Sequence, residues 1–115
     1  MLKINGMDGD IYLADSVIAR LVGCEASACF GVVGMAARNA ADSVVSLLSR
    51  DNMEKGVNIR YENNQLYVDL HIIISHGVNI PAISQAIEEK VSYSVEKFTG
   101  VPVRSVRIFV DSIKA

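Results

Sequence analysis

A long hydrophobic run is missing from this 115-residue chain. The longest apolar stretch, Ala28 to Ala37, has ten residues and includes two glycines, whereas a helix needs roughly 20 apolar residues to span a bilayer. The first residues also lack the charged start and the apolar core of a signal peptide. We therefore expect a cytoplasmic protein without direct membrane insertion.

An excess of one charge is missing too. Eleven basic residues stand against thirteen acidic ones, the net charge is −2, and no block of like charge occurs. Non-specific nucleic-acid binding depends on a basic surface. The charge balance therefore argues against nucleic acid as a partner.

Cysteine and histidine are scarce, with two residues of each. Cys24 and Cys29 lie five positions apart in a predicted helix, where a disulfide has poor geometry, so we expect reduced thiols, as in the cytosol. His71 and His76 are also five apart, and on a strand such residues point to opposite faces. Neither pair presents two metal ligands together, and a Cys–His nucleophile would need an orienting third group that the sequence does not supply. We expect no metal site and no cofactor.

Motifs of the common enzyme classes are absent as well: no phosphate loop, dinucleotide fingerprint or nucleophile elbow occurs. Glu88 and Glu89 are neighbours on a predicted solvated helix face and are a weak candidate for an acid–base pair.

Gly31-Val32-Val33-Gly34 matches the residue pattern of the G-x-x-G loop of KH RNA-binding modules, but its two valines favour burial over phosphate contact. We predict that the chain is not an enzyme. The alternative is a small-molecule or RNA-binding module, with KH-like use of Gly31–Gly34.

What the sequence does contain is enough apolar material for a core. Half of the residues are hydrophobic and 21% are charged, which is typical of a folded globular protein. A chain of this length forms about one domain and buries roughly two thirds of its unfolded surface. We predict a single domain over residues 1–115.

The clearest pattern is a β-hairpin. Apolar and polar residues alternate from Val57 to Tyr61 and again from Leu66 to Ser75, as in strands with one dry face. The intervening Glu62-Asn63-Asn64-Gln65 contains two asparagines, which tolerate the positive φ of a tight turn. The pattern predicts two antiparallel neighbouring strands.

A long amphipathic helix follows the hairpin. Asn79 is suited to cap its first N–H groups and Pro81 fits its first turn, while Gly100 supplies a left-handed cap residue and Pro102 prevents continuation. Its apolar positions recur at spacings of three and four and form one stripe: Ile80, Ile83, Ile87, Val91, Val95 and Phe98.

The remaining segments complete a β-α-(β)-α-β-β-α-β order. Met1 to Asp8 is expected to be a loose start. Asp15 is expected to open and cap a helix, since Ala14 before it cannot cap. The other predicted segments are strands at Gly9–Leu13, Gly31–Met35 and Val103–Val110 and a helix at Ala36–Arg50. We predict one small α+β domain with a mixed sheet and helices mainly on one face, because each helix has one apolar stripe and each strand one strongly apolar face.

A set of short motifs follows in a fixed order over residues 9–112, with a strand after the last of them: Gly9-Asp10-Ile11, Val17-Ile18-Ala19, Gly31 to Met35, Lys55 to Ile59, Asp69 to Ile74, Gly77 to Pro81 and Thr99-Gly100-Val101. Their order and spacing resemble those of the alkaline-shock-protein family, small envelope stress-response proteins of Gram-positive bacteria. The resemblance implies a non-enzymatic interaction protein in envelope homeostasis or stress tolerance. It also implies that some relatives dock at the membrane through a separate anchor protein, so that any membrane contact of this chain is expected to be peripheral and through such a partner.

The second face of the predicted sheet combines aromatic, basic and apolar residues, a composition typical of interaction surfaces. We predict a protein-contact surface on this face, comprising Arg60, Tyr67, Asp69, His71, Ile73, Arg107 and Phe109. The alternative is that the 36–50 helix or the N-terminal segment covers it. An open edge at the last strand would also invite self-association, so a homo-oligomer is a further expectation.

Overall fold

A computed structural model describes residues 2–36 and 56–114. The strands are β1 (Leu2–Asn5), β2 (Asp10–Leu13), β3 (Val32–Met35), β4 (Val57–Glu62), β5 (Gln65–Ser75) and β6 (Val103–Lys114), and the helices are α1 (Asp15–Ser27) and α3 (Ile80–Thr99). The mixed α+β architecture predicted from the sequence is confirmed. The predicted helix over Ala36–Arg50 falls outside the described residues, except for Ala36 itself.

The β4–β5 hairpin forms as the alternation predicts. The two strands pair antiparallel from Val57 opposite Leu70 to Glu62 opposite Gln65. Asn63 and Asn64 take positive φ values of 52° and 61°, which short polar side chains tolerate.

Strand β5 is the centre of a four-stranded sheet. On one side it pairs in parallel with β6, and on the other it pairs antiparallel with β4 and then with β3. The hairpin and the last strand are therefore neighbours, which the predicted surface on the second face requires. Strand β6 runs four residues beyond the predicted end at Val110, because Ser112, Ile113 and Lys114 continue to pair with the end of β5.

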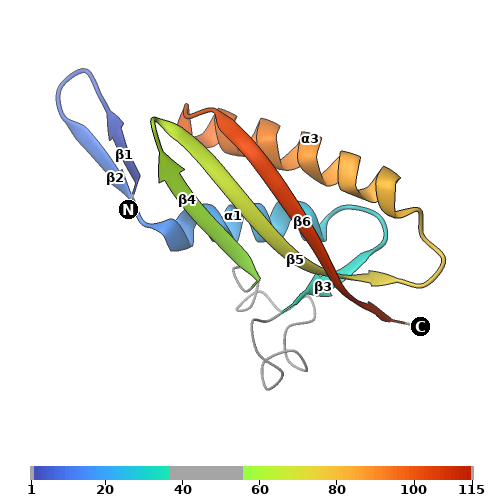
Figure 1. The fold of residues 1–115 in the computed structure, drawn as a ribbon. Coiled ribbons are helices and arrows are strands. Elements are labelled where there is room, and N and C mark those ends of the chain that lie inside the picture. Colours follow the sequence, from blue (N-terminus) through green and yellow to red (C-terminus); the bar gives the residue numbers. More distant parts are fainter. Residues whose placement is uncertain (1, 37–55, 115) are drawn as a thin grey trace.

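Both helices lie against one face of this sheet (Figure 1). The inward residues of β5 are almost fully buried beneath them: Leu66, Val68, Leu70, Ile72 and Ile74. Helix α1 contributes Ile18, Val22 and Ala26 to the same core. This layer arrangement leaves the opposite face of the sheet turned away from both helices.

Helix α3 begins and ends where the sequence predicts. The Asn79 side chain accepts a hydrogen bond from the Ala82 N–H at 3.0 Å, and Gly100 has φ 74° and donates to the Glu96 carbonyl at 2.8 Å. The predicted apolar stripe is wrong at both ends, since Ile80 and Phe98 are 43% and 55% exposed. Both lie in terminal turns, where the underlying layer gives the helix less cover.

At the C-terminal end of α3, Thr99 takes the buried position instead. Its hydroxyl donates to the Val95 carbonyl and accepts from the Val101 N–H. Helix α1 likewise has an exposed apolar residue in its first turn, since Val17 is 42% exposed.

The expected loose start is wrong. Leu2–Asn5 forms β1, which pairs antiparallel with β2 in a separate two-stranded sheet, and Leu2 is only 1% exposed. Strand β2 therefore belongs to this hairpin and not to the main sheet. Burial of Leu2 offsets the entropy of ordering a short terminal strand.

The expected cap at Asp15 is also wrong. The N-cap residue of α1 is Ala14, which makes no side-chain cap hydrogen bond, and Asp15 is the first helical residue. A carboxylate in the first turn still favours the positive end of the helix dipole.

Candidate interaction surface

The face of the main sheet that points away from the helices is called the outer face here, and its central residues are Arg60, Tyr67, Asp69, His71, Arg107 and Phe109. They meet because of the strand register. Arg60 lies opposite Tyr67, Asp69 opposite Arg107, and His71 opposite Phe109. Side chains in such cross-strand positions point to the same face, so the sheet brings six of the seven predicted surface residues into one patch.

Asp69 and Arg107 form the centre of the outer face. Arg107 Nε lies 2.8 Å from Asp69 Oδ1 and Nη2 lies 2.7 Å from Oδ2, the fork geometry of a bidentate pair. These hydrogen bonds hold the pKa of Asp69 below its usual range, although burial of the carboxyl acts in the opposite direction. The same bonds raise the pKa of Arg107 further above its usual value. Asp69 is 8% exposed, so the guanidinium satisfies a nearly buried carboxylate.

His71 and Phe109 stack beside this pair. Their ring centroids are 4.6 Å apart and their planes differ by 11°. His71 Nδ1 also lies 2.9 Å from Asp111 Oδ2. Asp111 was not among the predicted surface residues, although the alternation of β6 indicates that it shares a face with Arg107 and Phe109.

Two cation–π contacts join the aromatic and basic side chains. The Arg60 guanidinium lies 5.1 Å from the centre of the Tyr67 ring, and that of Arg107 lies 5.6 Å from the Phe109 ring. Such contacts contribute about 0.5–1 kcal/mol at exposed sites. They also restrict the rotamers of long side chains that would otherwise be mobile.

Ile73 does not share this exposure. It is 7% exposed, lies opposite Gly34 of β3 and Ser112 of β6, and is therefore unavailable for contact. Periodicity alone placed it on the outer face and could not show its burial.

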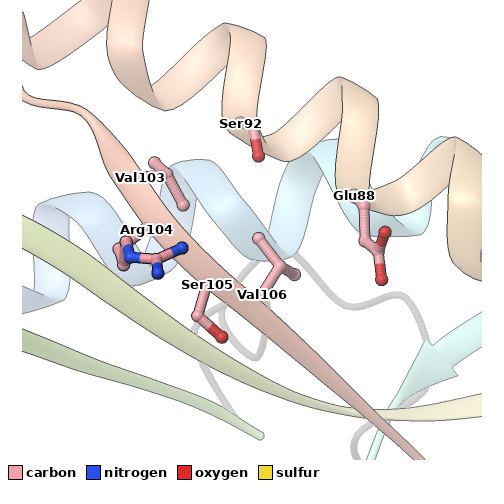
Figure 2. A pocket seen from close by; sticks show the side chains of 6 residues that line it. All are labelled: Glu88, Ser92, Val103, Arg104, Ser105 and Val106. Carbon is pink, nitrogen blue, oxygen red and sulfur yellow. The ribbon is translucent and has the colours of Figure 1, made fainter.

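A groove lies on the other side of β6, between this strand and α3. It has a volume of about 290 Å³ and is lined by Glu88, Ser92, Val103, Arg104, Ser105 and Val106. Figure 2 shows Glu88 and Ser92 extending from α3 toward β6. Sequence reasoning missed this groove, because it depends on how closely α3 crosses beside the last strand. Its lining includes none of the predicted surface residues, such as Tyr67, His71 and Arg107.

The segment Gly31–Gly34 does not form a phosphate-binding loop. Val32 to Met35 is strand β3, paired with β5, and Val32 and Gly34 are buried. Gly31 has φ 92°, and a Cβ there would lie 2.7 Å from Ile83 Cδ1. The glycine thus serves close packing against α3, which removes the structural basis of the KH-like alternative.

The two cysteines differ in environment. Cys24 is exposed and Cys29 is partly buried, with its Sγ 3.5 Å from the Glu25 carbonyl. Burial raises the pKa of the Cys29 thiol, which disfavours the reactive thiolate. Across residues 2–36 and 56–114, histidine, cysteine and acidic side chains do not gather in groups of three that could hold a metal ion.

Comparison with known proteins decides the family. The model of a family with cell envelope-related function, that of alkaline shock protein 23, matches residues 3–115. The chain belongs to this family. The resemblance drawn from the sequence motifs is confirmed, and with it a cell envelope-related function.

Two relatives cover nearly the whole chain. Spy1614 of Streptococcus pyogenes is 40% identical over 98% of this chain and 94% of its own length. YloU of Bacillus subtilis is 36% identical over 92% of this chain and 89% of its own length. Both are described as uncharacterized proteins.

One solved structure shares the fold. A zinc form of a MamM C-terminal domain variant matches with a TM-score of 0.56 at 13% identity, covering 88% of this chain and 85% of that one. At this identity the likeness concerns the fold alone. In the part of the chain that the structure describes, no helix has the length and apolar character needed to cross a bilayer.

Proposed function

We propose that this protein is a non-enzymatic adaptor in cell-envelope homeostasis that binds a protein partner through the outer face of its sheet. The observation that supports this most directly is the continuous set of contacts on that face. Arg60 packs on Tyr67, Arg107 pairs with Asp69 and approaches Phe109, and Phe109 stacks on His71.

The composition of this patch suits protein recognition. Arginine and tyrosine are enriched among the residues that dominate binding energy at protein interfaces. Arg60 and the Arg107 side chain are exposed, and Phe109 is 39% exposed. Contacts among the neighbours hold these side chains before binding, so less rotamer entropy is lost when a partner arrives.

The same contacts make catalysis a weaker hypothesis than protein binding for this face. Each charged group at the centre of the patch faces an opposite charge, and the histidine lies between Phe109 and Asp111. General acid–base chemistry needs such a group to face a reacting atom. We accordingly place the function in binding.

The proposed location is the cytoplasm, with the membrane reached through an anchored partner protein. Exposed guanidinium and aromatic groups favour a partner surface that combines carboxylates with apolar side chains. A second copy of the chain is the competing occupant of the outer face.

The test is cross-linked affinity capture of the tagged full-length protein from its own bacterium, with soluble and membrane fractions kept apart. The variant carries Tyr67→Asp with Phe109→Asp. The matched control carries Tyr93→Asp with Phe98→Asp, which changes two exposed aromatic residues of α3 in the same way. We expect the first variant to lose a defined membrane-fraction partner, and the control to retain it.

Circular dichroism must show that both variants are folded. Capture of the same partner by both variants contradicts the proposal. So does recovery of RNA or a tightly bound small molecule as the main ligand, since either result favours a binding module. Unfolding of the first variant alone would mean that Tyr67 and Phe109 are structural.

A further inference from the structure

Strand β6 presents a long free edge. Among the described residues it pairs only with β5, so its other edge has no strand partner in this part of the chain. At the start of β6, the Val103 N–H donates to the Glu96 side chain of α3 at 2.9 Å. An unpaired edge is a template for one more strand. Twelve residues are long enough for such pairing.

The apolar side of β6 is incompletely covered. Val106, Ile108 and Val110 face the core but are only partly buried, whereas the corresponding residues of β5 are buried. Helix α3 runs beside the strand without closing over it, and the 290 Å³ groove opens between them (Figure 2). A strand added at this edge would cover Val106 and Ile108 further, while the groove itself offers the polar side chains of Glu88, Ser92, Arg104 and Ser105 beside Val103 and Val106.

Two bulges limit where pairing can be regular. The β5–β6 register shifts between Val103 and Ser105 and again between Val110 and Ser112, which places Arg104 and Asp111 at the irregular positions. Bulges disrupt the ladder locally. The regular part of the edge is therefore Ser105–Val110, the length of a short strand.

The charges of the edge indicate what kind of segment fits. Arg104, Arg107 and Lys114 lie on β6 together with one acidic residue, Asp111. Asp111 already pairs with His71 and Arg107 with Asp69, which leaves Arg104 and Lys114 as the cations that a neighbouring segment can use. Arg104 lines the groove itself and Arg107 is on the outer face beside it. A neighbouring strand would thus place one set of side chains against Val106 and Ile108. At the Arg104 end of the groove, where Glu88 is the acidic residue of the lining, an acidic side chain of the alternate set would lie beside Arg104.

We propose that the edge of β6 and the α3–β6 groove bind an extended peptide segment of a partner protein by strand addition. The segment alternates apolar residues, directed toward α3, with acidic residues, one of which lies beside Arg104. Backbone pairing along an edge supplies affinity, and pockets for alternate side chains supply specificity. This site goes beyond the proposed function, because it uses the strand edge and the helix instead of the outer face.

The probe is a synthetic peptide of alternating valine and glutamate, slightly longer than Ser105–Val110. Two versions carry N-methyl groups on one or the other alternate set of residues, and a third replaces glutamate by lysine. Titration into the full-length protein is followed by amide chemical shifts and hydrogen exchange. We expect protection of β6 amides, loss of binding in one N-methylated version but not the other, and binding at least tenfold weaker for the lysine version.

Two variants test the groove. Ser92→Phe fills it from α3 and should weaken binding at least tenfold, whereas Ala86→Phe adds the same ring about 120° away around the exposed part of the helix and should leave binding unchanged. Arg104→Glu should reverse the preference between the glutamate and lysine peptides. Circular dichroism verifies the fold of each variant.

Failure of the valine–glutamate peptide to bind overturns the proposal, as does equal binding to Ser92→Phe and Ala86→Phe. Equal binding of the two N-methylated versions would exclude backbone pairing and would also overturn the proposal. Sedimentation of the free protein as a dimer with protected β6 amides would assign the edge to a second copy of the chain instead of a partner peptide.

Discussion

Arg107 of β6 donates two hydrogen bonds to the nearly buried carboxylate of Asp69 on β5, at 2.8 and 2.7 Å. The pair joins two parallel strands that are distant in the sequence. Its asymmetry matters, because the Arg107 side chain is 58% exposed and that of Asp69 only 11%. Loss of the arginine leaves the carboxylate poorly solvated, whereas loss of the aspartate leaves an arginine that water can reach.

We expect Arg107→Ala to lower the free energy of unfolding by about 1–3 kcal/mol, since it leaves a buried acceptor without its partner. Asp69→Ala and the double variant complete a cycle whose coupling energy should be about 0.5–3 kcal/mol. Urea denaturation measures all three. Arg60→Ala is the control, because Arg60 is exposed on the same face, and should change stability by no more than about 0.5 kcal/mol. Equal effects of Arg107→Ala and Arg60→Ala would show that the Asp69–Arg107 pair contributes nothing to the free energy of unfolding.

The lowered pKa of Asp69 makes part of the stability depend on pH. An aspartate in the unfolded chain titrates near about 3.9, and the hydrogen bonds from Arg107 hold the folded-state pKa below its usual value. The stabilisation is therefore fully present above the unfolded-state pKa and is lost as pH falls through the folded-state pKa. The free-energy difference between the natural chain and Asp69→Asn should shrink over that acidic range. Denaturation curves that stay parallel across it would contradict the prediction.

Gly56 and Gly77 provide a matched pair for backbone packing. Both have positive φ, 76° and 87°. A Cβ at Gly56 would collide with the Ala36 carbonyl and lie 2.8 Å from the His71 oxygen, while one at Gly77 would meet nothing within 4 Å. Gly77→Ala should cost about 1–2 kcal/mol from the left-handed backbone alone. Gly56→Ala should cost about 1–3 kcal/mol more from overpacking, and similar melting temperatures for the two variants would disprove this.

Local sequence signals predicted β5 and α3 well. Alternation in β5 and the three-to-four spacing in α3 each report which side of an element faces the core, and the turn asparagines and Gly100 mark the ends. The predictions that failed concern residues whose burial depends on neighbouring elements and not on their own helix or strand. Ile80 and Phe98 fit the stripe but occupy terminal turns, and Leu2 is buried although four residues carry little periodicity.

The candidate sites divide in the same way. Alternation predicted the outer face on the condition that β4, β5 and β6 are neighbours. The strand register meets this condition and joins residues that are far apart in the sequence. Burial of Ile73 and the groove at Glu88 and Ser92 depend on the crossing of separate elements. No periodicity within one element contains that information.

The two helix starts differ by one hydrogen bond, which allows a test in both directions. The Asn79 side chain accepts from the Ala82 N–H, whereas Ala14 has no side chain able to accept from the first turn of α1. Asn79→Ala should cost about 0.5–2 kcal/mol, and Ala14→Ser should gain a similar or smaller amount, since Ala14 already has the extended φ of −68° and ψ of 145° that a cap adopts. Chemical denaturation of the single variants and of the double variant, whose effects should add because each cap acts on its own helix, measures both. A destabilising Ala14→Ser would mean that the half-buried site at Ala14 cannot accept a hydroxyl, and packing rather than capping would then determine how α1 begins.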